Sequence, residues 1–430
     1  MSISHRATVN PELLSIFQSI SKSVKSSIEK AQKNAPDQFS TMHLVLIIIL
    51  TICVFVYLYY QMRFLETPTN ISRILRDSMG KSNSYSDNFN KRIGIKEYLR
   101  TLKDQGVPDT HLILTNFYIS TVNAAGIYIP DTGPFEYRSV YSQSGIVSPE
   151  AIRASLLGGA RCFVFDIWPD LSPGGQYGPI IQIVESSSSW RRTSINYLPF
   201  SVLLQLLVSE AFETGARPGT EDPLILFLRF RGTPRLETFN LTARAISSNL
   251  EAYRLSNIYN NCRNQDNIFQ TPITDLLKKV IIASNVRAEK SPLRDYINIG
   301  PKGGVKLEYS PGEAKNLPSG GKDQISIIKQ NLTWVSCMSE STEDELTNWD
   351  FAPSQSIGIM FCPINFWKGG KALDAYMKPD MFGKQSFKIK PVELRHVLDI
   401  LPLPLDPPNP GWVKSNDAGT PKYPKTLQMP

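Results

Sequence analysis

The chain has 430 residues, of which 41% are hydrophobic and 20% are charged. These proportions are typical of a globular protein with a sizeable core, and they exclude a wholly disordered or fibrous chain. Lys and Arg outnumber Asp and Glu by 46 to 39, which gives a net charge of +7. That surplus suits a nearby anionic membrane or polyanion, but it is too dilute to prove either, and we expect no nucleic acid as a partner.

The cysteines form no CxxC pair, so their spacing favours neither a disulfide framework nor a zinc site. We expect buried free thiols in a reducing compartment, and no metal or other cofactor. The five positions are Cys53, Cys162, Cys262, Cys337 and Cys362.

An apolar run near the N-terminus is the clearest physical signal. Residues 44–60 contain no charge, Gly or Pro, and three tyrosines lie near the end of the run. Extended to residues 43–62, the run is long enough to cross a hydrocarbon layer of about 30 Å. We interpret it as a single-pass transmembrane helix; a buried core helix and a cleaved signal peptide are the alternatives. Basic residues flank both ends equally, so the membrane orientation stays open.

Residues 1–42 precede the apolar run. Leu13, Phe17, Ile20, Val24 and Ile28 fall on one helical stripe, with lysines elsewhere around the helix. This amphipathic segment suits an anionic membrane surface, a partner helix, or a solvated helix.

Three regions follow the expected span. Residues 63–110 are interpreted as a linker with helices, in which 95–106 has helical spacing and a terminal Gly. Residues 111–400 alternate short apolar runs with helical stretches. Residues 401–430 hold eight prolines and are expected to form an extended tail that contacts the barrel or a partner.

The alternation within 111–400 predicts buried strands joined by helices. The expected helices are 150–159, 198–215 and 241–257. Such a pattern favours an α/β fold with a parallel sheet, and at least six strands in this length favour a TIM-type (β/α) barrel. The expected strands are 112–120, 161–168, 179–184, 223–230, 279–284 and 356–366.

The order of these segments resembles the phosphatidylinositol-specific phospholipases C. The resemblance covers about residues 110 to 396, and each piece alone is weakly specific. The pieces are Ser148-Pro149-Glu150-Ala151, LLGGARCFVFDIW (156–168), PIIQIV (179–184), DPLILFLRF (222–230) with the helix before it, TPITDLLKKVIIAS (271–284), GIMFCPINF (358–366) and FGKQSFKIKPVELR (382–395).

The resemblance implies chemistry that needs two histidines. Those enzymes cleave a phosphodiester through the neighbouring inositol hydroxyl, with one group accepting a proton and another donating one near neutral pH. The first histidine would lie at Val122 or Asn123, depending on a one-residue slip. The second would lie at Ile183 or Val184. Neither Val nor Ile can transfer a proton.

The positions implied for calcium and phosphate binding are also replaced. One acid of the family becomes Val164, whereas a second survives as Asp166; the glutamate on the fourth strand becomes Arg229. A cation at that position repels calcium. The phosphate-binding lysines would lie at Ala283 and Asn285. The resemblance therefore implies a barrel that lacks catalytic residues and a metal site.

The histidines present do not fill the implied positions. His111 precedes the first strand, so we expect it at the end of the barrel opposite the site. The others are His5, His43 and His396.

Arg229 and Arg231 alternate along one predicted strand, so their side chains share a face. The resemblance places Arg229 inside the barrel, where a guanidinium needs an anionic partner. Asp166, two strands away in the family's order, is the first candidate, and Glu185 is the second. In the alternative, Arg229 binds a phosphate or a phosphoinositide headgroup.

From these patterns we expect a membrane-anchored, catalytically inactive barrel that acts as a structural or scaffold protein, with the membrane and other structural proteins as partners and no small-molecule substrate. Such degenerate enzyme copies resemble virion proteins of large DNA viruses, so a minor capsid protein at the inner membrane is one form of this hypothesis. A cellular membrane-bound pseudoenzyme is the competing source. The alternative function is a divergent phosphodiesterase or a phosphoinositide-binding module.

Overall fold

The computed structural model describes most of the chain between residues 92 and 397. The described ranges are 92–128, 146–171, 178–183, 196–213, 219–259, 268–301, 308–317, 322–331, 334–335 and 348–397, with Lys22, Ser26, Leu50, Thr51, Cys53, Val54 and Ser194 as single residues. The amphipathic segment 1–42, the expected span 43–62 and the tail 401–430 lie outside these ranges, apart from those single residues. Within the described ranges, no helix is both long and apolar enough to cross a bilayer.

Four parallel strands form the central sheet, in the order β2-β5-β8-β9. Isolated parallel bridges extend this order at both sides, since Val122 pairs with Ile364 and Ala283 pairs with Ile299. Parallel strands that alternate with helices and continue past both edges in this way have the architecture of a (β/α) barrel. The strand bounds are Thr121–Val122, Cys162–Pro169, Leu224–Phe230 and Val280–Ser284.

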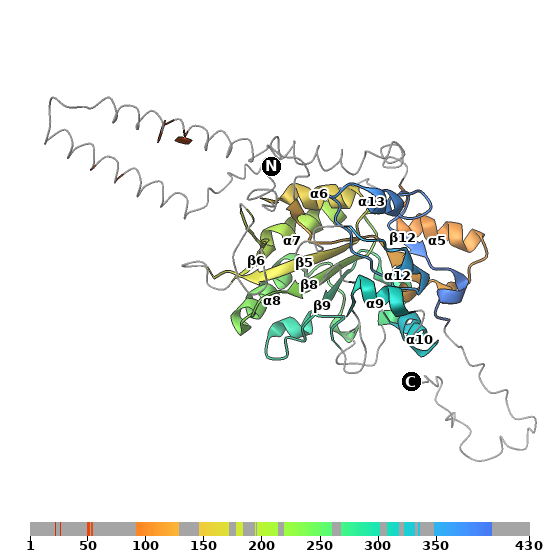
Figure 1. Ribbon diagram of the computed structural model, residues 1–430. Helices are drawn as coiled ribbons and strands as arrows, with labels where there is room; N and C mark the ends of the chain where they lie inside the picture. The colour runs from red at the N-terminus through yellow and green to blue at the C-terminus, as the bar shows by residue number, and fades with distance from the viewer. Residues whose placement is uncertain are drawn as a thin grey trace, which may run out of the picture.

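Three helices cover the outside of this sheet, and all three were expected from the sequence (Figure 1). The first begins at a Ser148 N-cap with Pro149 in its first turn, residue types that favour a helix start. The second ends in a π-helical turn, Ser209–Glu213. The helices are α6 (Pro149–Leu157), α7 (Phe200–Val208) and α8 (Leu236–Leu250).

Strand alternation divides the core into two apolar clusters. The inner cluster lies inside the barrel, and the outer cluster lies between the strands and the helices, where Phe165 and Phe200 meet edge to face at 5.4 Å. The inner cluster includes Ile119, Cys162, Val164, Ile225, Phe227, Ile281, Ala283, Ile299 and Phe361. The outer cluster includes Phe163, Phe165, Phe200, Leu203, Leu207, Leu224, Leu226, Leu228 and Ile246.

In the expected strand 112–120, Leu114–Asn116 is a 3₁₀ turn and only Phe117–Ile119 is a strand. Two further expected strands differ from the prediction. β6 (Pro179–Ile181) pairs antiparallel with the end of β5, so it lies beside the barrel rather than in its parallel series. The run 356–366 forms bridges at Phe361 and Ile364 without a continuous ladder. Periodicity reports burial, and both segments are buried; it does not report strand direction or the length of pairing.

Helix α5 (Ile95–Asp104) belongs to the packed unit, although it lies in the segment expected to be a linker. Its apolar residues Ile95, Leu99 and Leu102 are buried against the inner cluster. The N–H of Ile95 donates to Asp222 Oδ1 at 2.7 Å, and the Asp222 carboxylate lies 3.6 Å from Arg161 Nε. Asp222 and Arg161 directly precede β8 and β5, so α5 docks at the amino end of the strands, ahead of the boundary expected at residue 111.

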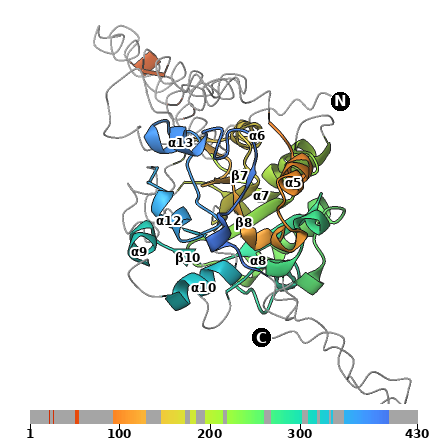
Figure 2. The ribbon, with the colours of Figure 1, turned by 90° about the vertical axis from the view of Figure 1, so that its right-hand side faces the viewer.

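The last strand, β12 (Phe387–Ile389), pairs antiparallel with β1 (Phe117–Ile119) at the same side of the barrel as α5 (Figure 1). Figure 2 shows the barrel with this side, and α5, facing the viewer. The remaining helices are α9 (Pro311–Asn316), α10 (Lys322–Gln330), α12 (Ala352–Ser356) and α13 (Lys371–Tyr376). The remaining strands are β3 (Ile127–Tyr128), β4 (Ile146–Val147), β7 (Leu198–Pro199), β10 (Glu308–Tyr309) and β11 (Trp334–Val335). The 3₁₀ turns are Asp109–His111, Leu114–Asn116, Asn257–Tyr259, Ile268–Gln270, Ile273–Leu276, Pro292–Asp295 and Val392–Leu394.

Candidate functional site

The candidate site lies at the carboxyl ends of the parallel strands, which we call the mouth of the barrel. Asp166 on β5 and Arg229 on β8 are direct cross-strand partners. Both follow inner-cluster residues at a spacing of two, Val164 and Phe227, so both side chains point into the barrel. The two strands are adjacent, which corrects the expectation that Asp166 lies two strands from Arg229.

Arg229 forms a two-pronged ion pair with Asp166, as expected. Its Nε lies 2.5 Å from Asp166 Oδ1 and its Nη2 lies 2.8 Å from Oδ2. Arg231 adds a third bond, from its Nε to Oδ1 at 2.8 Å. Arg229 is only 4% exposed and Asp166 9%. Both carboxylate oxygens are therefore bonded to guanidinium groups in a nearly water-free position.

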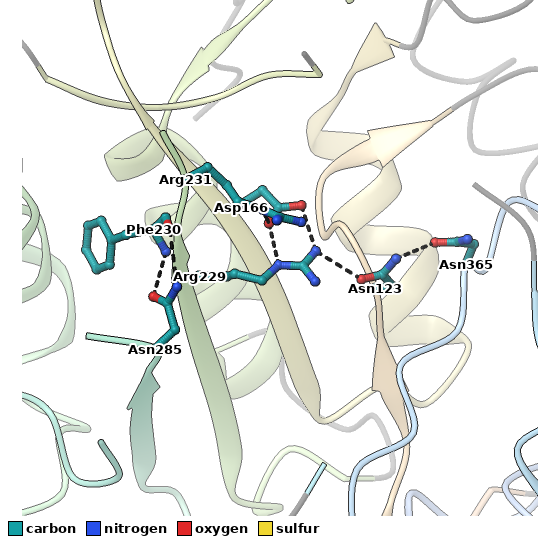
Figure 3. A network of polar contacts seen from close by, with 7 residues as sticks. All are labelled: Asn123, Asp166, Arg229, Phe230, Arg231, Asn285 and Asn365. Atoms are coloured by element: carbon teal, nitrogen blue, oxygen red, sulfur yellow. Dashed lines mark hydrogen bonds and ion pairs between the residues drawn. The ribbon is translucent and has the colours of Figure 1, made fainter. Parts of the chain in front are cut away.

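Amide side chains extend this ion pair across the mouth (Figure 3). Arg229 Nη2 donates to Asn123 Oδ1 at 3.3 Å, and Asn123 Nδ2 donates to Asn365 Oδ1 at 2.9 Å. The backbone N–H of Asn365 donates in turn to Asn348 Oδ1 at 2.7 Å. Asn123, Asp166, Arg229, Arg231 and Asn365 form what we call the mouth network.

Of the two positions implied for the first histidine, one reaches the mouth. Asn123 reaches the mouth network, whereas Val122 is buried in the outer cluster and pairs with Ile364. Val164 lies inside the barrel, one layer below Asp166. Each of these positions is therefore filled by a side chain with an evident packing or bonding role.

The second implied histidine position does not join the network. Ile183 lies past the end of β6, packs against the outer cluster, and its backbone N–H donates to Ser194 Oγ at 3.2 Å. Val184 and Glu185 lie outside the described residues. The antiparallel direction of β6 explains the difference, because its chain runs beside the barrel instead of ending at the mouth with the parallel strands.

Asn285 closes the rim between two strands. It follows β9, and its side chain accepts from the backbone N–H of Phe230 at 2.9 Å and donates to the carbonyl of Phe230 at 3.2 Å. Ala283, the other implied lysine position, is fully buried in the inner cluster. Asn285 thus fixes the ends of β8 and β9 together.

Sequence reasoning missed Asn348 and Asn365. Asn365 lies within the apolar run 356–366, and a lone amide in such a run is the available signal for a buried polar position. Asn348 gives no local signal, since its partner lies 17 residues away.

The two described histidines lie at the amino end of the barrel, as expected for His111. Asn116, just before β1, donates from Nδ2 to the carbonyls of His111 and His396 at 3.0 and 2.8 Å. His5 and His43 lie outside the described residues.

Electrostatics fix the protonation state of the mouth network. Burial alone raises the pKa of Asp166, but the charges of Arg229 and Arg231 outweigh burial and lower that pKa to about 2. The carboxylate therefore stays ionised near neutral pH and exchanges no proton there. Two guanidiniums share one carboxylate, so the three side chains carry a net charge of +1.

The mouth does not fit a calcium ion. Asp166 is the one carboxylate in the mouth network, and both of its oxygens are already bonded to cations. Across the part of the chain that the structure describes, no three His, Cys, Asp or Glu side chains are arranged to hold a metal.

Comparisons with known proteins give fold-level likenesses only. No protein-family model matches this chain, and no curated protein matches it in sequence. Among solved structures it is similar to PLC21 of L. pealei, with 16% identity and a TM-score of 0.48, and to PLC21 of S. officinalis, with 16% identity and a TM-score of 0.46. Each match covers 67% of this chain, which spans only 40% and 38% of those two proteins.

A bacterial structure shows the same kind of likeness. It is a calcium-dependent phosphoinositol-specific phospholipase C from a Pseudomonas species, with 10% identity and a TM-score of 0.39. The match covers 65% of this chain and 96% of that one. The barrel assignment does not depend on these scores, because it follows from the strand pairings.

Proposed function

We propose that this chain is a non-catalytic, phospholipase C-like barrel that serves as a membrane-anchored scaffold. The mouth network supports the proposal most strongly. Active sites of (β/α) barrels lie at the carboxyl ends of the strands. In this chain that position is occupied by side chains that bond to one another.

The chemistry of the network supports the same conclusion. Phosphodiester cleavage through a neighbouring hydroxyl needs a group that accepts a proton near neutral pH. Asn123 and Asn365 carry amides, and Arg229 and Arg231 carry guanidinium groups, which offer hydrogen-bond donors and no base. The pKa of Asp166 is about 2, so its carboxylate is a poor proton acceptor near pH 7.

The anchor and the scaffold role rest on the flanking sequence. A span at 43–62 would hold the barrel at a membrane, and a tail with eight prolines suits contact with a protein partner. We propose that the protein links a membrane to a protein assembly, in the form of a minor capsid protein between a virion's inner membrane and its shell. A cellular membrane-bound pseudoenzyme is the second form.

A turnover assay tests the inactivity. Purified full-length protein is incubated with phosphatidylinositol vesicles, with and without calcium, beside an Asp166→Asn variant. We expect both proteins to release inositol phosphate at the rate of a vesicle blank. Turnover that co-purifies with the wild-type protein and is lost in the variant would overturn the proposal.

Membrane extraction tests the anchor separately. Because residues 44–60 carry no charge, the protein should stay with membranes through carbonate and high-salt washes. A variant that lacks residues 1–62 should be released into the soluble fraction. Release of the full-length chain by salt alone contradicts the single-span assignment.

A second candidate is a phosphoinositide-binding module, and one observation favours it. The net charge of +1 among Asp166, Arg229 and Arg231 could attract an anionic headgroup to the mouth. Vesicles with and without phosphoinositide distinguish the two functions. Binding that Arg231→Gln abolishes, at an unchanged melting temperature, supports the headgroup; equal binding by both proteins supports the scaffold.

A further inference from the structure

The end of β12 and the residues after it are docked on the start of β1. We call residues 390–397 the C-terminal strap. The backbone N–H of Lys390 donates to the carbonyl of Asn116 at 2.8 Å, and the carbonyl of Lys390 accepts from Arg395 Nε at 2.6 Å. Farther along, the N–H of His396 donates to Asn116 Oδ1 at 2.7 Å. The strap backbone is thus held at two points by one residue of the barrel.

The side chain of Lys390 is buried beneath this strap. It is 0% exposed, and its Nζ has no hydrogen-bond partner among the residues that the structure describes. The nearest favourable contact is the ring of Tyr118 on β1, whose centroid lies 5.7 Å from Nζ. A buried ammonium without a carboxylate is costly, and one distant aromatic ring offsets only part of that cost.

Among the described residues, no carboxylate is bonded to Lys390. Burial lowers the pKa of Lys390 to about 7, and the opposing effect of Cys362, in the segment that bridges to β1, is smaller. Glu393 is exposed on the strap. Other titratable or charged groups nearby are Tyr98 on α5, Tyr118 on β1, Lys388 on β12, Tyr376 on α13, His111 before β1, and Arg395 and His396 on the strap.

We propose that the C-terminal strap is a pH-sensitive latch, which Lys390 holds closed as a neutral amine and loosens when it gains a proton. The amine can become solvated only if β12 or the strap moves away from β1. Protonation therefore favours the open strap. The charges of the mouth network are paired with one another, so we expect the strands of the barrel to stay folded when the strap opens.

Linkage gives the direction and size of the effect. In the docked strap the pKa of Lys390 is about 7, against 10.5 in water, so the open state binds more protons between those values. Opening becomes easier as the pH falls through this window and levels off below about 7. Between pH 8.5 and pH 6 the open population should rise roughly thirtyfold.

Hydrogen exchange of the full-length chain measures this opening. Protection of amides in 386–397, corrected for the intrinsic pH dependence of exchange, should fall roughly thirtyfold from pH 8.5 to pH 6 in the wild type. In Lys390→Met, which keeps the side-chain volume and lacks the amine, protection should be equal at both pH values. Protection of β5 and β8 should stay constant in both proteins.

Lys388→Met is the matched control, since Lys388 is a half-buried lysine two residues earlier on β12. This variant should keep the full pH dependence. A wild-type strap with constant protection, or a dependence that survives in Lys390→Met, overturns the proposal. If Lys390→Met does not fold, carbon-detected titration of the wild-type lysines decides: a lysine midpoint near 7 supports the latch, and midpoints all above 9.5 refute it.

Discussion

The strands β5 and β8 carry a buried aspartate beside arginines at each of their ends, and the two ends behave differently. At the carboxyl end, Asp166 bonds to Arg229 and Arg231. At the amino end, Asp222 lies 3.6 Å from Arg161, and Arg92 acts on it at longer range. The pKa of Asp166 is lowered to about 2, whereas burial raises the pKa of Asp222 above its ordinary value.

Direct bonds, rather than the number of nearby cations, explain the difference. Asp166 accepts three charge-assisted hydrogen bonds of 2.5 to 2.8 Å. Asp222 accepts one backbone N–H, from Ile95, and its ion pair with Arg161 is long. Both carboxylates are buried, but the bonds to Asp166 outweigh burial and keep it ionised, whereas the fewer bonds to Asp222 do not outweigh burial. The mouth is the more tightly ordered end, although enzymes of this architecture keep their reactive groups there.

Removing the central arginine of each cluster should give the largest effect. Arg229→Ala leaves Asp166 buried with one remaining partner, so it should destabilise the barrel by about 3–5 kcal/mol. Arg161→Ala should cost about 2 kcal/mol, because Asp222 can take up a proton more easily. Urea unfolding of both variants at pH 7 measures the difference.

The outcome also separates structure from ligand binding. If Arg229→Ala keeps its melting temperature and loses affinity for phosphoinositide vesicles, the structural interpretation of Arg229 fails. If Arg161→Ala costs as much as Arg229→Ala, the two ends do not differ in the way that their geometry indicates.

The pH dependence of unfolding should also distinguish Asp166 from Asp222, with a smaller change in the free energy of unfolding. The folded pKa of Asp166 lies below its ordinary value, so its stabilisation is present above about pH 4 and is lost as the pH falls toward 2, by about 2 kcal/mol. The folded pKa of Asp222 is raised, so its contribution has the opposite sign and grows as the pH falls. Asp166→Asn should flatten the loss of stability between pH 5 and 2, and Asp222→Asn should steepen it. Unfolding free energies across this range test the signs, and equal slopes in the two variants would contradict them.

Arg231→Ala should have the smallest effect. Its guanidinium contributes one bond to a carboxylate that keeps both bonds from Arg229, and it lies at the rim with 13% of its side chain exposed. We expect a loss of about 1 kcal/mol in thermal unfolding. A loss as large as that of Arg229→Ala would mean that the two arginines hold Asp166 equally.

Short-range patterns in the sequence predicted the buried strands, whereas the Asp166–Arg229 pair was expected from the family resemblance, which placed Arg229 inside the barrel. Continuous apolar runs indicate buried strands, and a single charge near the end of such a run needs a partner. The antiparallel direction of β6 and the bond from Asn348 to Asn365 depend on how distant segments meet, which local periodicity does not encode. Lys390 is the most instructive failure: lysines are almost always exposed, so composition alone gave no reason to place this one in the core.

The docking of α5 has a consequence for access to the mouth. Arg92, where the packed unit begins, donates to the carbonyl of Gly158 just before β5, and the strap ends beside Asn116 just before β1. Both flanking segments therefore join the unit at the amino ends of the strands, on the side of α5 and β12 (Figure 1). A segment attached there is joined to the end of the barrel opposite the mouth. In the function proposed above, both attachments, to the membrane and to a partner, would therefore join the barrel at that end.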